Sequence, residues 1–126
     1  MTEPHEASAD VAYADVAELR RRLADGSLTS EALVRGLLDR ISAIDAADSA
    51  IALRSILAVS QDAIADARRR DKERAAGIAS GPLHGIPVVV KDNIEAVGLP
   101  CTAGSRALVD SPVQQDAPLV ARLRGA

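Results

Sequence analysis

The sequence has almost no aromatic side chains: it contains no Trp, no Phe and a single Tyr among 126 residues. Its apolar fraction is nevertheless 48%, so Ala, Val, Leu and Ile must supply nearly all of any hydrophobic core. These side chains bury less area than aromatic rings do, whereas ordering the backbone costs about 1–2 kcal/mol per residue. The composition therefore predicts one soluble globular domain with a modest core and low stability as an isolated unit.

Other absences restrict the cellular setting and the partners. The single cysteine, Cys101, allows no internal disulfide, which fits a reducing compartment. Residues 1–10 lack the basic and apolar segments of a secretory signal, and no apolar run approaches the length of a membrane span. The formal charge of −3 gives no electrostatic reason to bind nucleic acid. We therefore expect a cytoplasmic protein, with neither nucleic acid nor a membrane as its partner.

Four segments have the signature of a helix. The first begins at the capping pair Asp15 and Glu18 and stops at Gly26. The second follows Thr29 or Ser30, and its apolar residues form one stripe at helical spacing up to residue 44. The arginine runs within the first and third helices, at residues 20–22 and 68–70, are interleaved with or followed by acids and predict solvated helix faces.

The third and fourth helices have less complete signals. Ser60 is the predicted cap of the third helix, which we expect to end at Gly77. Only its first two turns are expected to be buried, because residues 68–74 are almost all charged. Asp116 is the predicted cap of the fourth, which has Pro118 in its first turn.

Two segments have the signature of a β-strand. Residues 51–59 alternate in polarity and are rich in branched side chains. Residues 86–90 form an unbroken apolar run that begins at a proline, which is typical of a strand covered on both faces. The pattern predicts an α/β protein with helices packed on a mixed β-sheet. We expect a flexible tail at residues 1–14 and a single domain over residues 15–126, because no internal linker divides the chain.

Lys91 is the one residue whose sequence position suggests a catalytic role. It follows three valines directly, at the point where the predicted strand leaves the sheet, and ligand sites of open α/β sheets gather there. A lysine shielded from water in such a place has a lowered pKa and can accept a proton. On this local pattern alone, a salt-bridge partner at the edge of the sheet is the more frequent role, so the residues themselves leave both roles open.

The run of residues 81–94, from Gly81 through Lys91 to Ile94, resembles the N-terminal hallmark of the amidase-signature family nearly residue for residue. The similarity continues through residues 98–100, 102–108 and 116–124. In that family the lysine that ends this strand is catalytic, and Lys91 is the residue that matches it. The resemblance implies that this chain is an incomplete N-terminal part of the amidase-signature fold, which ends before the loop that carries the nucleophile.

The resemblance also implies a Ser–cis-Ser–Lys mechanism for hydrolysing the carbon–nitrogen bond of a non-peptide amide. An unprotonated Lys91 accepts a proton through a bridging serine, and a second serine attacks the carbonyl. Neither of those serines lies in this sequence, since Ser105 and Ser111 are the only serines after Lys91 and neither has a Gly/Ser-rich setting. We therefore expect the 126-residue chain alone to be catalytically inert.

Several small and polar residues surround the lysine in the sequence. Thr102, Gly104 and Ser105 form a small-residue loop that either contacts the substrate of a complete enzyme or serves packing. Asp92 and Asn93 are expected to be structural, since short polar side chains suit a turn. His84 and Cys101 have no partners at metal-ligand spacing, so we expect His84 to be a turn residue, Cys101 to be an inert buried thiol, and no metal site.

The family resemblance leaves the role of the whole protein between three alternatives. The first is an amidase that acts on a small-molecule amide with no cofactor, with a homodimer as one option for the full-length protein. The second is one subunit of a glutamyl- or aspartyl-tRNA amidotransferase, an enzyme that makes glutaminyl- or asparaginyl-tRNA. The third is an inert truncated product.

Overall fold

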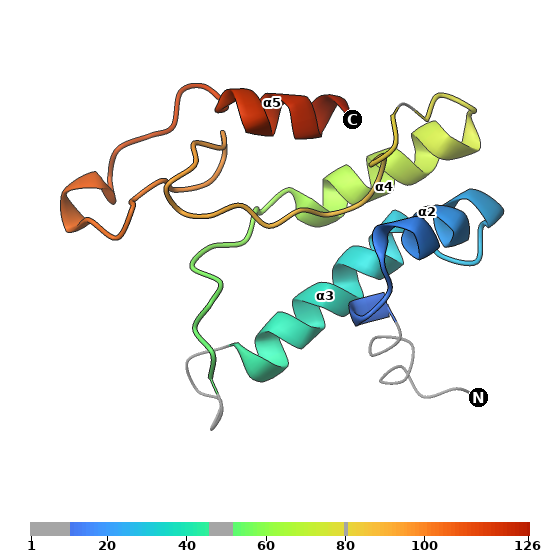
Figure 1. The fold of residues 1–126 in the computed structure, drawn as a ribbon, viewed down its shortest axis with the longest axis horizontal. Coiled ribbons are helices and arrows are strands. Elements are labelled where there is room, and N and C mark those ends of the chain that lie inside the picture. Colours follow the sequence, from blue (N-terminus) through green and yellow to red (C-terminus); the bar gives the residue numbers. More distant parts are fainter. Residues whose placement is uncertain (1–10, 46–51, 80) are drawn as a thin grey trace.

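The computed structural model describes residues 11–45, 52–79 and 81–126, which form helices joined by irregular segments (Figure 1). The helices are α2 (Val16–Asp25), α3 (Ser30–Ile44), α4 (Ala63–Ala75), the short 3-10 helix η1 (Arg106–Leu108) and α5 (Pro118–Gly125). All four predicted helices are thus confirmed. Within the described residues, no helix is both long and apolar enough to cross a membrane.

Local sequence signals explain the start of the first two of these helices. The side chain of Asp15 accepts a hydrogen bond from the Glu18 amide at 2.8 Å and begins α2. Gly26 ends it with a φ of 79°, a conformation that glycine adopts without strain. Thr29 caps α3 by accepting from the Ala32 amide at 3.1 Å. Asp15 and Thr29 are therefore confirmed as caps, whereas the Glu18 carboxylate of the predicted capping pair bonds Arg21 instead.

The predicted caps of the other two helices are wrong. Helix α4 begins at Ala63 after Asp62, whose side chain makes no capping hydrogen bond, and the Ser60 hydroxyl instead accepts from the Asp62 amide. Helix α5 follows Ala117, also without a side-chain cap. Asp116 turns away from that helix start because its carboxylate accepts from the Val97 amide at 2.7 Å and pairs with Arg124 at 2.8 Å. Distant partners therefore take the Asp116 side chain, whereas Ser60 bonds the residue just before α4.

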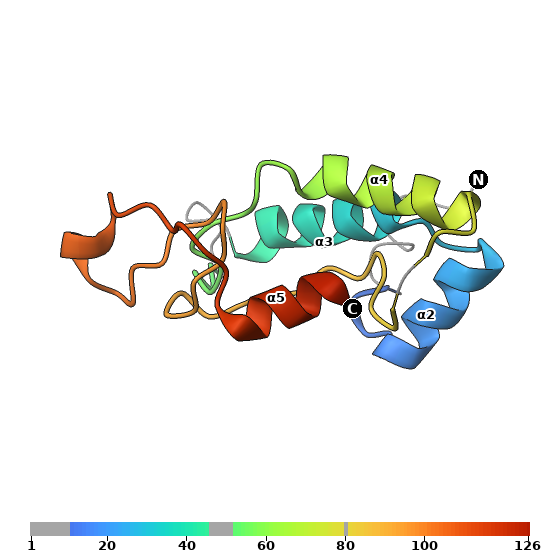
Figure 2. The same cartoon turned by 90° about the horizontal axis from the view of Figure 1, so that it is seen from above.

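The hydrophobic core lies where α2 meets the beginning of α3. Leu33 has no exposed surface, and Ile86 packs against the edge of the core from far along the chain. Helices α3 and α4 lie side by side in both views and contact each other extensively (Figures 1 and 2). The buried core residues are aliphatic without exception: Val11, Leu19, Leu23, Leu28 and Leu33. Residues 1–10 of the expected tail lie outside the described residues, whereas Val11 belongs to this core.

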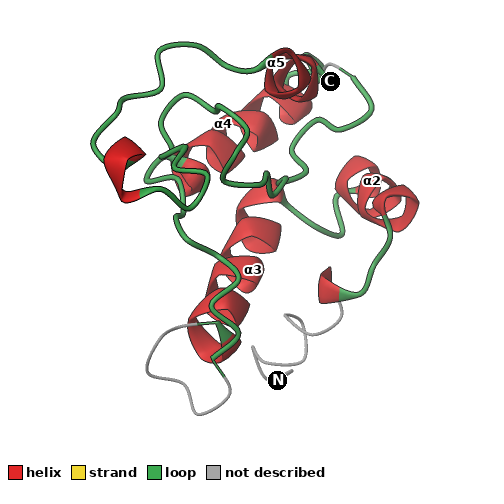
Figure 3. Cartoon of the chain, turned by 60° about the vertical axis from the view of Figure 1, so that its left-hand side comes forward, coloured by secondary structure: helices red, strands yellow, loops and turns green. Residues whose placement is uncertain are grey.

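The described residues contain no β-strand (Figure 3). The prediction of strands at residues 51–59, of which Ile51 lies outside the described residues, and at 86–90 is therefore wrong for this chain. A strand requires a neighbour, and the backbone of Val88–Val90 makes no backbone hydrogen bond with another described residue. The side chains are correspondingly exposed, with Val89 76% and Leu57 71% accessible. The predicted mixed sheet is not formed within these residues.

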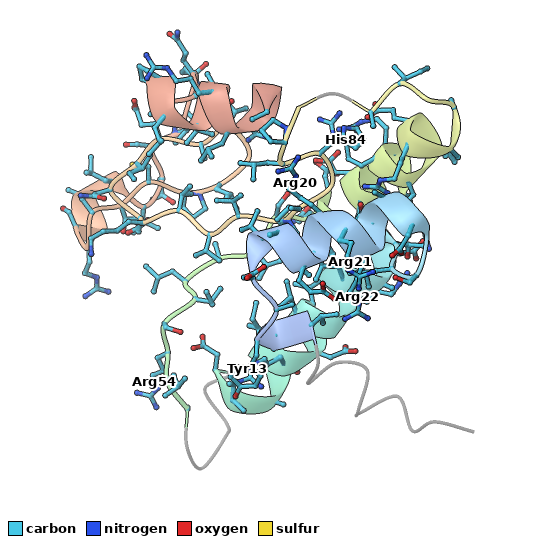
Figure 4. All side chains as sticks on the ribbon, turned by 45° about the vertical axis from the view of Figure 1, so that its right-hand side comes forward. Tyr13, Arg20, Arg21, Arg22, Arg54 and His84 are labelled. Atoms are coloured by element: carbon cyan, nitrogen blue, oxygen red, sulfur yellow. The ribbon has the colours of Figure 1, made fainter. Side chains whose placement is uncertain are left out.

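The two arginine runs have different roles. Arg21 lies on α2 (Figure 4) and bonds Glu18 and Asp25 of the same helix, so this run forms the predicted solvated face. The charged second half of α4 is not only solvated, contrary to prediction. Arg68 reaches Glu31 of α3 at 2.9 Å, and Arg74 is only 19% exposed. Sequence periodicity missed these contacts because they join two helices.

The exposed apolar side chains predict that this chain associates with itself. We expect its apparent mass to rise with concentration in sedimentation velocity, because residues 53–59 and 88–89 present apolar surface without a neighbour. The double variant Leu57→Lys/Val89→Lys should reduce this association. Its matched control, Gln61→Lys/Gln114→Lys, adds the same charge at exposed polar positions and should leave it unchanged. A strictly monomeric chain with one sharp unfolding transition would contradict the prediction.

Candidate functional site

Lys91 lies at the end of the irregular segment that follows Ile86, which packs against the core. Its carbonyl accepts a hydrogen bond from the Ile94 amide at 2.9 Å, which closes a tight turn directly after the apolar run. The side chain of Lys91 is exposed. The shielding from water that a proton-accepting lysine requires is therefore not provided by the described residues.

Asp92 connects the lysine turn to the loop of small residues that begins at Thr102. Its carboxylate accepts from the Thr102 amide at 2.9 Å, from the Thr102 hydroxyl, and from the Gly104 amide at 3.4 Å. Its backbone carbonyl accepts from the Ala103 amide at 3.1 Å. The hydrogen bond from the Thr102 hydroxyl, followed by that from its amide, lowers the pKa of Asp92. The carboxylate is therefore held ionised in a structural role, as predicted.

The three residues predicted to contact substrate lie together in this loop. Gly104 has a φ of 77°, and its amide also contacts the Thr102 hydroxyl at 3.1 Å. Ser105 accepts from the Ala107 amide at 3.3 Å and begins η1. Ala103 has a φ of 49°, which is a strained conformation for a residue with a Cβ. The structure thus brings Thr102, Gly104 and Ser105 into one loop, which Asp92 joins to the turn that carries Lys91.

An open groove of about 560 Å³ lies next to this pair of loops. It is mainly apolar, and Cys101 and Ser111 lie on its wall. None of the four predicted site residues lines it. The remaining lining residues come from the lysine turn, the 108–113 segment and the start of α5: Asn93, Ile94, Glu95, Leu108, Pro112, Val113, Ala117, Pro118 and Leu119.

Two further predictions concern metals and isolated side chains. Cys101 is partly buried, and no group of three or more potential metal ligands occurs among the residues that the structure describes. His84 lies in a turn, as expected, but its side chain is only 5% exposed and packs beside α4 (Figure 4). Its Nε2 lies 3.1 Å from the Arg70 carbonyl and 3.7 Å from the Glu73 carboxylate. His84 therefore attaches the turn to the helix.

Sequence reasoning missed Asp71 and Arg74 altogether. Arg74 donates to Asp71 at 2.7 Å, to the Ser30 hydroxyl at 2.9 Å and to the His84 carbonyl at 3.2 Å. The spacing of Asp71 and Arg74 by three residues is the only sequence signal, and it is equally typical of an exposed ion pair on one helix. These two residues hold the segment that leads to Lys91.

Comparison with known proteins gives a consistent result. Residues 32–126 match the Amidase family. The chain is 39% identical over 118 residues to a glutamyl-tRNA(Gln) amidotransferase subunit of Salinispora tropica, in an alignment that covers 93% of this chain and 23% of that protein. It superimposes on the peptide amidase of Stenotrophomonas maltophilia with a TM-score of 0.84 and 43% identity, covering 90% and 23% of the two chains.

An amidase family protein from Bacillus anthracis is a further match, with a TM-score of 0.85, 35% identity, and coverage of 96% of this chain and 24% of that one. The chain therefore spans about a quarter of the length of these relatives. Its described residues have the fold of the corresponding quarter of an amidase, although no strand forms within them. From residue 32 to its last residue, this chain belongs to the amidase family.

Proposed function

We propose that this chain supplies the proton-accepting lysine, Lys91, of an enzyme that hydrolyses the carbon–nitrogen bond of an amide by a Ser–cis-Ser–Lys mechanism. The observation that carries the proposal is the arrangement of residues 91–105. The lysine turn and the Thr102–Ser105 loop are joined at four points through Asp92 alone, so that the candidate base and the candidate substrate contacts form one unit. Such rigid positioning is what an enzyme site requires.

The chemistry assigned to Lys91 depends on its surroundings in the complete site. A neutral amine can accept a proton from a serine hydroxyl, which makes the hydroxyl oxygen nucleophilic toward an amide carbonyl. Water stabilises the ammonium form, which cannot accept a proton, so the exposed Lys91 must be covered in the active state. The apolar side chains of Val88 and Val89 in the same segment provide a surface on which a covering polypeptide could pack.

The class of amide is a further part of the proposal. The likeness to a peptide amidase favours a peptide-like amide over the non-peptide amide that the family resemblance implied. The apolar groove beside the 101–105 loop is compatible with either, since it offers few polar groups of its own.

A second candidate is a role within an amidotransferase, which the 39% identity to the Salinispora tropica protein favours. The two candidates differ in what they require. An amidase releases product from a simple amide without other proteins. A component of an amidotransferase works together with the other components on a tRNA-linked substrate, so turnover that appears only with those components would decide for the second candidate.

We predict that Lys91 is essential in an active context. The test is a chimera of the Stenotrophomonas maltophilia peptide amidase in which the matched quarter is replaced by this chain. Lys91→Met should lower kcat/KM for the parent's amide substrate by about 100- to 10,000-fold, the range of general base catalysis. Lys72→Met, at the other lysine of the chain, is the matched control and should stay within about twofold.

The outcomes of the chimera experiment are distinct. The 126-residue chain assayed alone should show no turnover. A folded chimera that keeps full activity with Met at position 91 would disprove the role of the lysine. A chimera that folds with the parent's thermal stability but hydrolyses no amide would count against the amidase function. A smaller graft of residues 81–108 keeps the test available if the larger graft does not fold.

We also predict that the Asp92 carboxylate holds the site together down to low pH. Its lowered pKa means that the ionised, hydrogen-bonded form persists above the ordinary pKa of about 3.9 and is lost only as the pH falls through the lower folded-state pKa. The NMR chemical shift of the Thr102 amide proton should therefore change with pH, with a midpoint below about pH 3.9. Asp92→Asn should abolish that pH-dependent change. A midpoint at or above the ordinary pKa of an aspartate would contradict the prediction that the ionised carboxylate holds the two loops together at low pH.

A further inference from the structure

The guanidinium of Arg74 joins three parts of the chain that are distant in sequence. Its donors contact Asp71 on its own helix, the Ser30 hydroxyl at the start of α3, and the His84 carbonyl in the turn before Ile86. Only the planar fork of an arginine presents donors in several fixed directions at once. The side chains of Arg74 and Asp71 are 19% and 23% exposed, so these contacts are largely shielded from solvent.

Asp71 fixes the other side of this junction. Its two carboxylate oxygens accept from the Ser30 amide at 2.7 Å and from the Glu31 amide at 3.0 Å. Burial alone would raise the pKa of Asp71, but these backbone hydrogen bonds and the contact with Arg74 lower it overall. Its negative charge lies at the positive end of the α3 dipole, where it is stabilised. Helix α4 is thereby held in one position relative to α3.

The turn at residues 84–85 is fitted closely to this junction. Gly85 has a φ of 82°, and a Cβ at this position would collide with the Ser30 hydroxyl and the Arg74 guanidinium. The His84 ring contacts the Arg70 carbonyl. Ile86 then packs against the hydrophobic core. Arg74 and its partners, together with the packing of Ile86 on the core, therefore hold the start of the segment that ends at Lys91.

We propose that Asp71 and Arg74 are positioning residues for Lys91, which set where the 86–91 segment begins and hence where its terminal amine lies. This inference rests on the proposed function. The segment makes no backbone hydrogen bond of its own between Val88 and Val90 with another described residue, so its two ends carry its placement. Asp92 fixes the far end against Thr102, and the Arg74 junction fixes the near end. Without the Arg74 contacts, the start of the 86–91 segment can shift, and Lys91 shifts with it.

The experiment uses the active peptide amidase chimera, after Lys91→Met has been shown to abolish its activity. Arg74→Met should lower kcat about 10- to 100-fold, because a displacement of about 1 Å of a catalytic group has effects of this size. KM should change by less than about threefold, since substrate contacts are retained. Arg74→Lys, which keeps the charge but not the fork, should recover at most a small part of the lost rate.

The matched control is Arg69→Met, which removes the same charge from the same helix. Arg69 forms its ion pairs with Asp66 and Glu73 of α4 and is 54% exposed, so kcat should stay within about twofold. A second readout is the pH dependence of kcat/KM, whose acidic limb should move in Arg74→Met and Asp71→Asn because the surroundings of the amine change.

The results separate positioning from stability and from the function itself. A lower thermal midpoint in Arg74→Met, with kcat and the pH profile unchanged well below that midpoint, would overturn the proposal and leave a structural role. Loss of activity in Lys91→Met together with full activity in Arg74→Met would do the same while the proposed function stands. Activity that survives Lys91→Met would refute the proposed function first. Amide hydrogen exchange on the 126-residue chain should show faster exchange at Ile86 in Arg74→Met than in Arg69→Met.

Discussion

The structure depends on how the first amides of α3 are satisfied. A helix begins with amide groups that have no partner within the helix, and each needs an acceptor. Here Thr29 supplies one for Ala32, and Asp71 reaches across from α4 to accept from Ser30 and Glu31. Together with the Arg68–Glu31 ion pair, this carboxylate therefore pairs the two helices, and it also bonds Arg74. The placement of the turn at His84, and of the segment that follows it, is a consequence of that pairing.

Aspartate side chains that accept hydrogen bonds from backbone amides hold the irregular segments of this chain, which has almost no aromatic residues. The main core cluster is formed by five buried aliphatic side chains, and most residues of the irregular segments lie outside it. Four aspartates accept hydrogen bonds from the backbone amides of other segments. Asp45 binds the amides of Ser55 and Ile56, Asp71 those at the start of α3, Asp92 those of Thr102 and Gly104, and Asp116 that of Val97. The loops are thus ordered by directed polar contacts.

This organisation explains which features the sequence could predict. The four helices and the caps of the first two follow from contacts within about four residues, which a sequence displays directly. Ser60 and Asp116 have the right residue type for a cap, but Asp116 is taken by Val97 and Arg124, which are distant in sequence. The strands depend on partners that the sequence does not display. The candidate site residues are predicted from the motif, whereas Asp71 and Arg74 could not be, because their contacts join separate helices.

The exposure of Lys91 and the absence of strands from the described residues have the same physical origin. An apolar segment becomes a strand, and a lysine at its end becomes a base, only when neighbours remove both from water. Val88, Val89 and Lys91 all lie on one short segment with exposed side chains. Under the proposed function, a polypeptide that packs on the valines also covers the amine. Completion of the fold and activation of the base are then one event, for which the two anchored ends of the segment prepare the geometry in advance.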